Sequence, residues 1–349
     1  MREAHVNLMS HPISLIVGTA LNDTVLYRLI TYDTETYRVD LMRLFDDKVH
    51  DRILEKKKRL DAHRPLPSSI VRKVQQQMEI EYIYNSNAIE GNTLKLRETQ
   101  LILEEGITIK GKSLREHLEV RNHPKAIEYI GKLTARSLNE HDIFVLHQII
   151  MKGIDEEVGR FRNTEVRIVG ADFTPPPAYE VPHLIGELAN WYNRNPDELR
   201  PIELAAVFHH RFVYVHPFHD GNGRIARLLM NLTLLRNGYP ISVILNVERK
   251  KYYDVLRKAD HGDPSPLVSL VASSAERSLD IYLRAIEPTE KVDRLLTLAE
   301  ASRRSPYSQE YLSLLARRRR IAAMKMEGKW MLTERELQRY LKEIRDRKK

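Results

Sequence analysis

The sequence feature that most constrains the fold is a helical periodicity that runs through the middle of the chain. Apolar side chains recur there at three- and four-residue spacing, which is the spacing of one buried helix face. A helix is predicted from Ser68 toward Ala88, with Gly91-Asn92 as its stop signal. Further helices are predicted at 113–135, 140–152, 181–195, 202–215, 224–237 and 248–260. The pattern therefore indicates a mainly α-helical protein.

Three stretches depart from this pattern. Residues 24–32 and 36–41 are rich in β-branched and aromatic residues, so a short β-rich N-terminus is expected before a charged helix at 46–64. Val166 to Gly170 alternates like a strand and is soon followed by Pro175-Pro176-Pro177, which predicts a β-hairpin flap inside the helical core. The 349 residues suggest two or three domains, which we place at 1–67, 68–290 and 300–349.

Composition excludes several classes of site and location. The chain has no cysteine, which excludes disulfides, Cys-ligated zinc, iron–sulfur clusters and a thiol nucleophile. No apolar run approaches the roughly 18 residues that span a bilayer. The longest one near the N-terminus, Ile13 to Leu21, lacks a basic leader and a cleavage site. We expect no membrane contact and a cytoplasmic location.

The positive charge is concentrated at one end of the chain. Residues 301–349 carry 15 Lys and Arg against 6 Asp and Glu, a net charge of +9, whereas the whole chain carries +8. The remaining 300 residues are therefore nearly neutral, with a net charge of −1. The chemistry of the body and the contacts of the basic tail are separate questions.

The most informative stretch is His216-Pro217-Phe218-His219-Asp220-Gly221-Asn222-Gly223-Arg224-Ile225-Ala226-Arg227, between two predicted helices. Gly221 and Gly223 let backbone N–H groups approach a ligand, and the start of a helix adds partial positive charge. This loop is therefore a candidate anion cradle. Of the nearby histidines, we expect His219 to face solvent and His209 and His210 to pack within their helix.

The side chains of this stretch fit phosphate chemistry. Arg224 and Arg227 are three residues apart, so they share one face of a helical turn and suit a polyphosphate. Asp220 is a candidate ligand for Mg²⁺ against phosphate oxygens, and a neutral His216 is a candidate general base. Each residue alone would fit an ordinary helix–helix connection. The ordered set favours a phosphoryl- or nucleotidyl-transfer site.

The stretch resembles the signature of the Fic family, His-x-Phe-x-Asp/Glu-Gly-Asn-Gly-Arg-x-x-Arg, at every fixed position. Gly159 to Gly170 resembles the family's flap, and Lys251 to Asp263 resembles its segment near the nucleotide base. Upstream, Ser86-Asn87-Ala88-Ile89-Glu90-Gly91-Asn92 is similar to the motif of its inhibitory helix. The likeness extends from about Tyr82 to Ala285 and implies a Fic-type helical core.

The resemblance implies transfer of AMP from ATP to a Ser, Thr or Tyr hydroxyl of a protein. His216 would deprotonate the hydroxyl, Asp220 would bind Mg²⁺, and Arg227 would lie nearest the γ-phosphate. The residues implied in ATP binding are Arg167, Ile168, Val169, Gly170, Asp220, Gly221, Asn222, Gly223, Arg224, Ile225, Ala226, Arg227, Tyr252, Tyr253 and Asp260. The resemblance leaves open self-modification, removal of AMP and a homodimer.

The same resemblance implies self-inhibition through Glu90, with Ser86 in the same motif. A glutamate that reaches Arg227 would form a charge-assisted pair and keep this arginine from the γ-phosphate. We therefore expect Glu90→Gly to raise activity. The alternative is that Glu90 is an ordinary carboxylate at a helix end.

Residues 300–349 read as a small separate unit. A helix at 308–316, the basic run Arg317 to Arg320, a hairpin tip at Gly328-Lys329-Trp330 and a helix at 334–345 follow one another. This order resembles the winged-helix modules of excisionase and MerR-like proteins, which implies contact with DNA. The basic run would also fit a solvated surface or a docking face. A second hypothesis for the whole chain is a DNA-binding regulator that uses the Fic core to sense nucleotides.

Overall fold

The computed structural model describes residues 44–66, 68–168, 171–287, 295–326 and 328–346. The strands predicted at 24–32 and 36–41 lie outside these described residues, as do Val169 and Gly170 of the predicted flap. No helix in the described part of the chain combines the length and the apolar character needed to cross a membrane.

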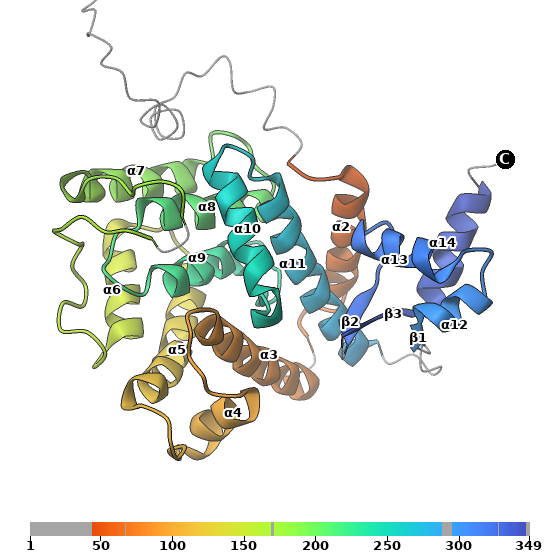
Figure 1. Ribbon diagram of the computed structural model, residues 1–349, viewed down its shortest axis with the longest axis horizontal. Helices are drawn as coiled ribbons and strands as arrows, with labels where there is room; N and C mark the ends of the chain where they lie inside the picture. The colour runs from red at the N-terminus through yellow and green to blue at the C-terminus, as the bar shows by residue number, and fades with distance from the viewer. Residues whose placement is uncertain (1–43, 67, 169–170, 288–294, 327, 347–349) are drawn as a thin grey trace, which may run out of the picture.

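The body is built from helices, as the periodicity predicts (Figure 1). In chain order they are α2 (Asp47–Ala62), α3 (Ser68–Ile89), α4 (Leu96–Glu105), α5 (Leu114–Leu133), α6 (Glu140–Met151), η2 (Ala178–Glu180), α7 (Val181–Arg194), α8 (Pro201–Val215), α9 (Asn222–Arg236), η3 (Asn246–Glu248), α10 (Arg249–Asp260) and α11 (Ser265–Ile286). All the helices predicted in the body are confirmed. The sequence reading did not single out α4 and α11.

Local chemistry explains where several of these helices begin. The Ser113 hydroxyl accepts a hydrogen bond from the Glu116 backbone N–H, and the Glu116 carboxylate accepts one from the Ser113 backbone. Asn139 and Asp142 form the same reciprocal box at the start of α6. Each box satisfies backbone donors that a helix N-terminus leaves without partners. Helix α8 begins at Pro201, which has no N–H to satisfy.

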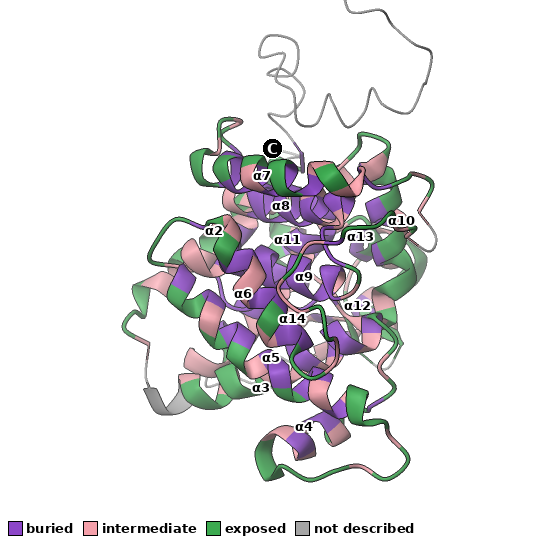
Figure 2. Cartoon of the chain, turned by 90° about the vertical axis from the view of Figure 1, so that its left-hand side faces the viewer, coloured by how far each residue is buried: buried purple, intermediate pink, exposed green. Residues whose placement is uncertain are grey.

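Helices α8 and α9 lie at the centre of the body and form the packed pair around which the others assemble (Figure 2). Almost every residue of α9 from Arg224 to Leu234 is buried, including its polar side chains. One continuous apolar core extends from Leu44 to Leu283. The turn between α8 and α9, which carries the candidate motif, is therefore held between two helices that are buried along most of their length.

Helix α2 belongs to this body, although the domain boundaries above place it with the N-terminal segment. Ile53 and Leu60 of α2 are fully buried in the same core as α11. Arg52 donates two hydrogen bonds, of 2.6 and 2.7 Å, to the carboxylate of Glu276 in α11, and both side chains are nearly buried. The Pro65–Pro67 joint consequently does not separate two cores.

The predicted β-hairpin flap is wrong over its described residues, because 161–168 contain neither helix nor strand. A hairpin needs a ladder of backbone hydrogen bonds, and here the segment is held by a side chain instead. The buried Arg162 guanidinium donates to the carbonyls of Thr164 and Pro176. The following prolines, Pro175 to Pro177, offer no N–H groups for a ladder.

The C-terminal module has its own small core around Leu296, Leu312, Leu332 and Leu337. Its elements are β1 (Leu295–Thr297), α12 (Leu298–Arg303), α13 (Gln309–Arg317), β2 (Met324–Met326), β3 (Lys329–Thr333) and α14 (Glu334–Asp346). The three strands form one antiparallel sheet in the order β1-β3-β2. The predicted helices are confirmed, and the chain turns at Gly328 as predicted. Lys329 and Trp330, which the prediction placed at the hairpin tip, lie in β3, and β1 and α12 were not foreseen.

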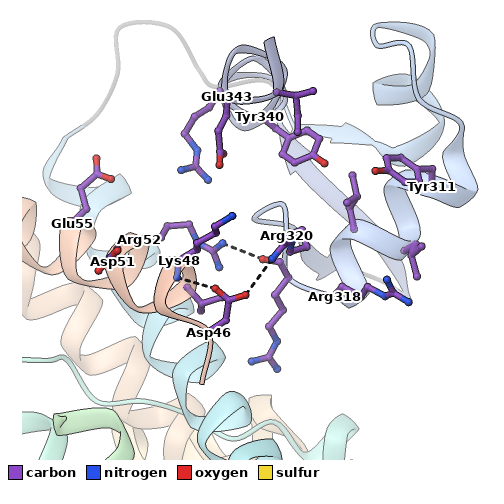
Figure 3. A pocket seen from close by; sticks show the side chains of 16 residues that line it. Asp46, Lys48, Asp51, Arg52, Glu55, Tyr311, Arg318, Arg320, Tyr340 and Glu343 are labelled. Atoms are coloured by element: carbon purple, nitrogen blue, oxygen red, sulfur yellow. Dashed lines mark hydrogen bonds and ion pairs between the residues drawn. The ribbon is translucent and has the colours of Figure 1, made fainter. Parts of the chain in front are cut away.

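The basic run of this module meets the N-terminal end of α2 (Figure 3). Arg320 pairs with Asp46 at 3.2 Å, and Arg52 donates to the backbone carbonyl of Arg319 at 3.1 Å. A cavity of about 780 Å³ lies between α2, α13 and α14. Tyr311 and Leu314 of α13 and Arg318, directly after this helix, line it. The face of α13 that carries Tyr311 and Leu314 therefore borders the cavity between the module and the body.

Candidate active site

The turn between α8 and α9 has a backbone that few residue types adopt. His216, directly after α8, has a left-handed φ of 49°, and its N–H donates to the Phe212 carbonyl at 3.1 Å. Gly221, directly before α9, has φ 83°. The Asn222 side chain closes the loop, because it accepts from the Phe218 N–H at 3.0 Å and donates to the Phe218 carbonyl at 2.7 Å. The geometry of the turn is thus fixed from both ends.

His216 is suited to act as a base. Burial lowers the pKa of its imidazole to about 4, so the ring is neutral at pH 7. Nδ1 lies 3.3 Å from the Val213 carbonyl, an acceptor, which assigns the ring proton to Nδ1. Nε2 then carries the free lone pair. A neutral imidazole of this tautomer can remove a proton from a hydroxyl placed beside Nε2.

Two residues that the sequence reading did not assign a role hold this loop in place. Arg162, fully buried, donates from Nε to the His216 carbonyl at 2.8 Å. His147 of α6 stacks on Phe218, with ring centroids 3.8 Å apart. Its Nδ1 accepts from the Gly159 N–H at 2.8 Å, and its Nε2 lies 3.3 Å from the Asp220 carbonyl. Burial lowers the pKa of His147 to about 4, so this link between α6 and the loop is uncharged.

Asp220 and Arg224 form an ion pair at the start of α9. The Arg224 guanidinium is 1% exposed and donates to Asp220 Oδ1 at 2.9 Å. The other oxygen, Oδ2, pairs with Arg115 of α5. Burial alone would raise the pKa of Asp220, but Arg224, the Gly221 N–H and Arg115 lower it below its usual value. Arg224 Nε has no hydrogen-bond partner among the described residues, so its N–H can still donate to a bound anion.

Arg227 is engaged by the end of helix α3. Its Nη2 donates to Glu90 Oε1 at 2.7 Å and to the Ser86 carbonyl at 2.8 Å, and its Nε donates to the Ser86 hydroxyl at 3.0 Å. Burial alone would lower the pKa of Arg227, but the Glu90 carboxylate raises it above its usual value. The structure thus brings together Glu90, Ser86 and Arg227, which stand up to 141 residues apart in sequence.

The Glu90 carboxylate also fills the space above the first turn of α9. A Cβ added to Gly223 would overlap with Glu90 Oε1. An anionic oxygen therefore lies directly on the backbone at a helix N-terminus, beside a buried guanidinium. This is the place where backbone geometry and the helix dipole favour negative charge.

Tyr252 and Tyr253 flank this position. Tyr252 is buried, its hydroxyl lies 3.4 Å from Arg227 Nη1 and 2.9 Å from His209 Nε2, and burial raises its pKa. Tyr253 is 39% exposed and lies under the Arg249 guanidinium, whose Nε donates to the Ile89 carbonyl at 2.7 Å. An exposed aromatic ring beside the anion position can stack on a nucleotide base.

Other predicted ligands lie differently. Asp260, at the end of α10, pairs with His210 of α8 at 2.8 Å. Ile225 and Ala226 are fully buried in the apolar core, so their side chains are not available to a ligand. Arg167 is exposed, and Ile168 is half-buried. His209 and His210 are buried in α8, and His219 is exposed, as expected.

The donor set around Asp220 fits a magnesium ion that arrives with a phosphate ligand. Among the described residues, no three His, Asp or Glu side chains gather into a metal cluster. Mg²⁺ bound with a nucleotide needs only one or two carboxylates, because waters and phosphate oxygens complete its octahedron. Asp220 is such a carboxylate, 42% exposed and next to the anion position. It can hold the ion once one of its oxygens is free.

The chain resembles known proteins over this region. The model of the Fic/DOC family matches residues 137–234. The protein adenylyltransferase Fic of Nematostella vectensis is 36% identical over 247 residues, which are 69% of this chain and 57% of that protein. The chain spans about half the length of the curated relatives that it matches.

Solved structures show the same likeness. A Fic-domain-containing signaling protein from Bacteroides thetaiotaomicron is 31% identical with a TM-score of 0.63, and the match covers 69% of this chain and 98% of that one. Fic-1 from C. elegans is 34% identical with a TM-score of 0.63, and the match covers 69% and 73% of the two chains. With the motif on an α8–α9 turn and the Glu90–Arg227 pair in place, the chain belongs to the Fic/DOC family.

Proposed function

We propose that the chain transfers AMP from ATP to a Ser, Thr or Tyr hydroxyl of a protein. The observation that carries the proposal is an anion position at the start of α9, filled by the Glu90 carboxylate and bordered by Arg224, Arg227 and the neutral His216. A base beside an anion cradle is what transfer of a nucleotidyl group requires. The name protein adenylyltransferase, carried by relatives 35–38% identical, supports the same reaction.

The residues have separate tasks in this reaction. His216 Nε2 removes the hydroxyl proton while the hydroxyl oxygen attacks the α-phosphorus of ATP. The bond from the α-phosphorus to the oxygen that bridges it to the β-phosphorus breaks, and pyrophosphate leaves. Arg224 and Arg227 hold the phosphates and offset their charge. Asp220 would hold Mg²⁺, which neutralises phosphate charge when bound.

Two buried side chains keep this geometry without touching the substrate. Arg162 fixes the His216 carbonyl, and His147 fixes the Asp220 carbonyl. Both contacts are made to backbone carbonyls, and they position the base and the metal ligand relative to each other. Such preorganisation lowers the reorganisation needed in the transition state.

We further propose that Glu90 restrains this activity. While Glu90 holds Arg227, this arginine cannot bind a terminal phosphate, and the carboxylate occupies the space above Gly223. A hydrogen bond to a charged group contributes roughly 1.5–3 kcal/mol, so its loss corresponds to a change of about 10- to 100-fold. Glu90→Gly should raise the rate of AMP transfer by that factor.

The test measures AMP transfer from labelled ATP to the chain itself and to proteins of a lysate. Glu105→Gly is a matched control, because Glu105 is also an exposed glutamate at a helix end. His216→Ala in the Glu90→Gly chain should abolish the signal. Equal rates for the wild-type chain and the Glu90→Gly chain would reject the restraint, and a signal independent of His216 would reject the mechanism.

The finer aspects of the activity are part of this proposal. They are self-modification, removal of AMP, homodimer formation and a cytoplasmic location. Intact mass spectrometry of the Glu90→Gly chain after incubation with ATP tests the first of these, and incubation of an AMP-modified chain with the wild-type protein tests the second. The relatives are named adenylyltransferases rather than regulators, so we do not pursue a nucleotide-sensing regulator as the main function.

We also propose that the C-terminal module contacts DNA, on the basis of its net positive charge and its order of elements, β1-α12-α13-β2-β3-α14. Arg317 and Arg318 at the end of α13 are exposed, whereas Arg320 already pairs with Asp46. Binding of the full chain to duplex DNA should weaken steeply as salt rises. An absence of binding at low salt would overturn this part of the proposal.

A further inference from the structure

Asp220 is held by a cation that the reaction described above does not use. Arg115 lies in the first turn of α5, more than a hundred residues before the motif, and its guanidinium pairs with Asp220 Oδ2. Oδ1 of the same carboxylate accepts from Arg224 at 2.9 Å. Both oxygens of the one carboxylate in the loop are thus occupied by guanidinium groups.

The pair belongs to a closed network of charges. Glu119, one helical turn after Arg115, lies 3.3 Å from Arg115 Nε and 3.2 Å from Arg224 Nη1. Asn92 donates to the second oxygen of Glu119 at 2.9 Å. Asn92 follows Glu90 by two residues, so the network that holds Asp220 is tied to the end of the same segment that holds Arg227.

The two arginines on Asp220 differ in their freedom to leave. The Arg224 side chain is 1% exposed and locked in the core, whereas that of Arg115 is 54% exposed. An ion pair with so exposed a side chain is a weak interaction, so Arg115 can move into solvent at small cost. Oδ2 is therefore the oxygen that can be vacated.

We propose that Arg115 is a second restraint on this site, which competes with the divalent cation for Asp220 Oδ2. A guanidinium at hydrogen-bond distance from the carboxylate repels a divalent ion that approaches the same oxygen. Release of Arg115 then accompanies entry of the metal with its nucleotide. The inference rests on the proposed function, but it concerns the metal rather than the γ-phosphate that Glu90 blocks.

The experiment measures nucleotide binding without turnover. ATP is titrated calorimetrically into the chain that carries Glu90→Gly and His216→Ala, at a series of Mg²⁺ concentrations. The result is the Mg²⁺ concentration at which the affinity for ATP reaches half of its maximum. Addition of Arg115→Gln should lower this concentration roughly two- to fivefold, the factor that corresponds to an exposed ion pair. Affinity for ATP in the presence of a chelator should not change.

Arg121→Gln is the matched control, because Arg121 is an exposed arginine on the same helix and should leave the Mg²⁺ dependence unchanged. An unchanged Mg²⁺ dependence in the Arg115→Gln chain would overturn the inference while leaving AMP transfer by the Glu90→Gly chain intact. Weaker ATP binding in the chelator would also overturn it, because Arg115 would then be a phosphate ligand. Failure of the proposed function would give a different result from failure of this inference. In that case the Glu90→Gly chain would bind Mg²⁺ and ATP without transferring AMP.

Discussion

The molecule contains two groups of arginines that look alike in sequence and differ in the structure. Arg224 and Arg227 lie in the first turns of α9, are 1% exposed, and pair with carboxylates of distant segments, Glu119 of α5 and Glu90 directly after α3. The run from Arg317 to Arg320 begins at the last residue of α13 and lies nearer the surface. Its described contacts with the body include the Arg320–Asp46 ion pair and the hydrogen bond from Arg52 to the Arg319 carbonyl. Proximity in sequence to other arginines therefore says little about the role of an arginine. What differs is the set of partners that distant segments supply.

The comparison is tested most strongly by deleting one arginine from each group. Arg227→Ala removes the partner of Glu90 and the donor to the buried Ser86 hydroxyl and carbonyl, so it should cost about 2–4 kcal/mol of unfolding free energy. Arg320→Ala removes a half-exposed pair and should cost less than about 1 kcal/mol. Urea unfolding measures both values, and equal costs would remove the distinction between the two groups.

Acid should weaken the body and spare the C-terminal module. Burial lowers the pKa of His123 to about 3 and those of His147 and His216 to about 4, so each is neutral in the folded protein well below the ordinary histidine pKa of 6.5. Stability from these neutral rings is complete above pH 6.5 and is lost as the pH falls toward 4. The loss is about 1.4 kcal/mol per pH unit for each histidine. Residues 295–346 contain no histidine.

The two tryptophans allow the two regions to be followed separately. Trp191 lies in α7 of the body, and Trp330 lies in β3 of the module. In a Trp330→Phe chain, the free energy of unfolding from the Trp191 signal should fall between pH 6.5 and 5, and His147→Gln should reduce the slope whereas the exposed His141→Gln should not. In a Trp191→Phe chain, the Trp330 signal should change less. Parallel pH profiles would contradict this separation.

The smallest effect on stability is expected from the exposed arginines of the module. Arg317→Gln with Arg318→Gln should leave unfolding and AMP transfer unchanged. It should reduce the slope of log DNA affinity against log salt concentration by an amount that corresponds to roughly two phosphate contacts. Arg97→Gln with Arg121→Gln, on the exposed surface of the body, is the control pair. If both pairs of substitutions weaken DNA binding equally, the module has no special role in it.

Local pattern was sufficient for most of the helices and for the motif, and insufficient for the contacts between distant segments. Apolar spacing and capping residues located α5 through α10, because these signals lie within one element. The flap was wrong because an alternating run does not reveal whether a second strand will pair with it. Arg115, His147 and Arg162 carry no local signal of their contacts with the turn, since their partners are 54 to 105 residues away. The assignment of Asp260 likewise missed its partner, His210.

The absence of a Cβ at Gly223 limits which substitutions can relieve the proposed inhibition by Glu90. Under the proposed function, the Glu90 oxygen and a substrate phosphate need the same volume over Gly223, so any larger residue there would exclude both. Restraint and catalysis cannot be separated by substitution at this position. Variants that escape inhibition by Glu90 must instead arise on α3 or in the segment that follows it, where a change removes this carboxylate and leaves the substrate's place intact.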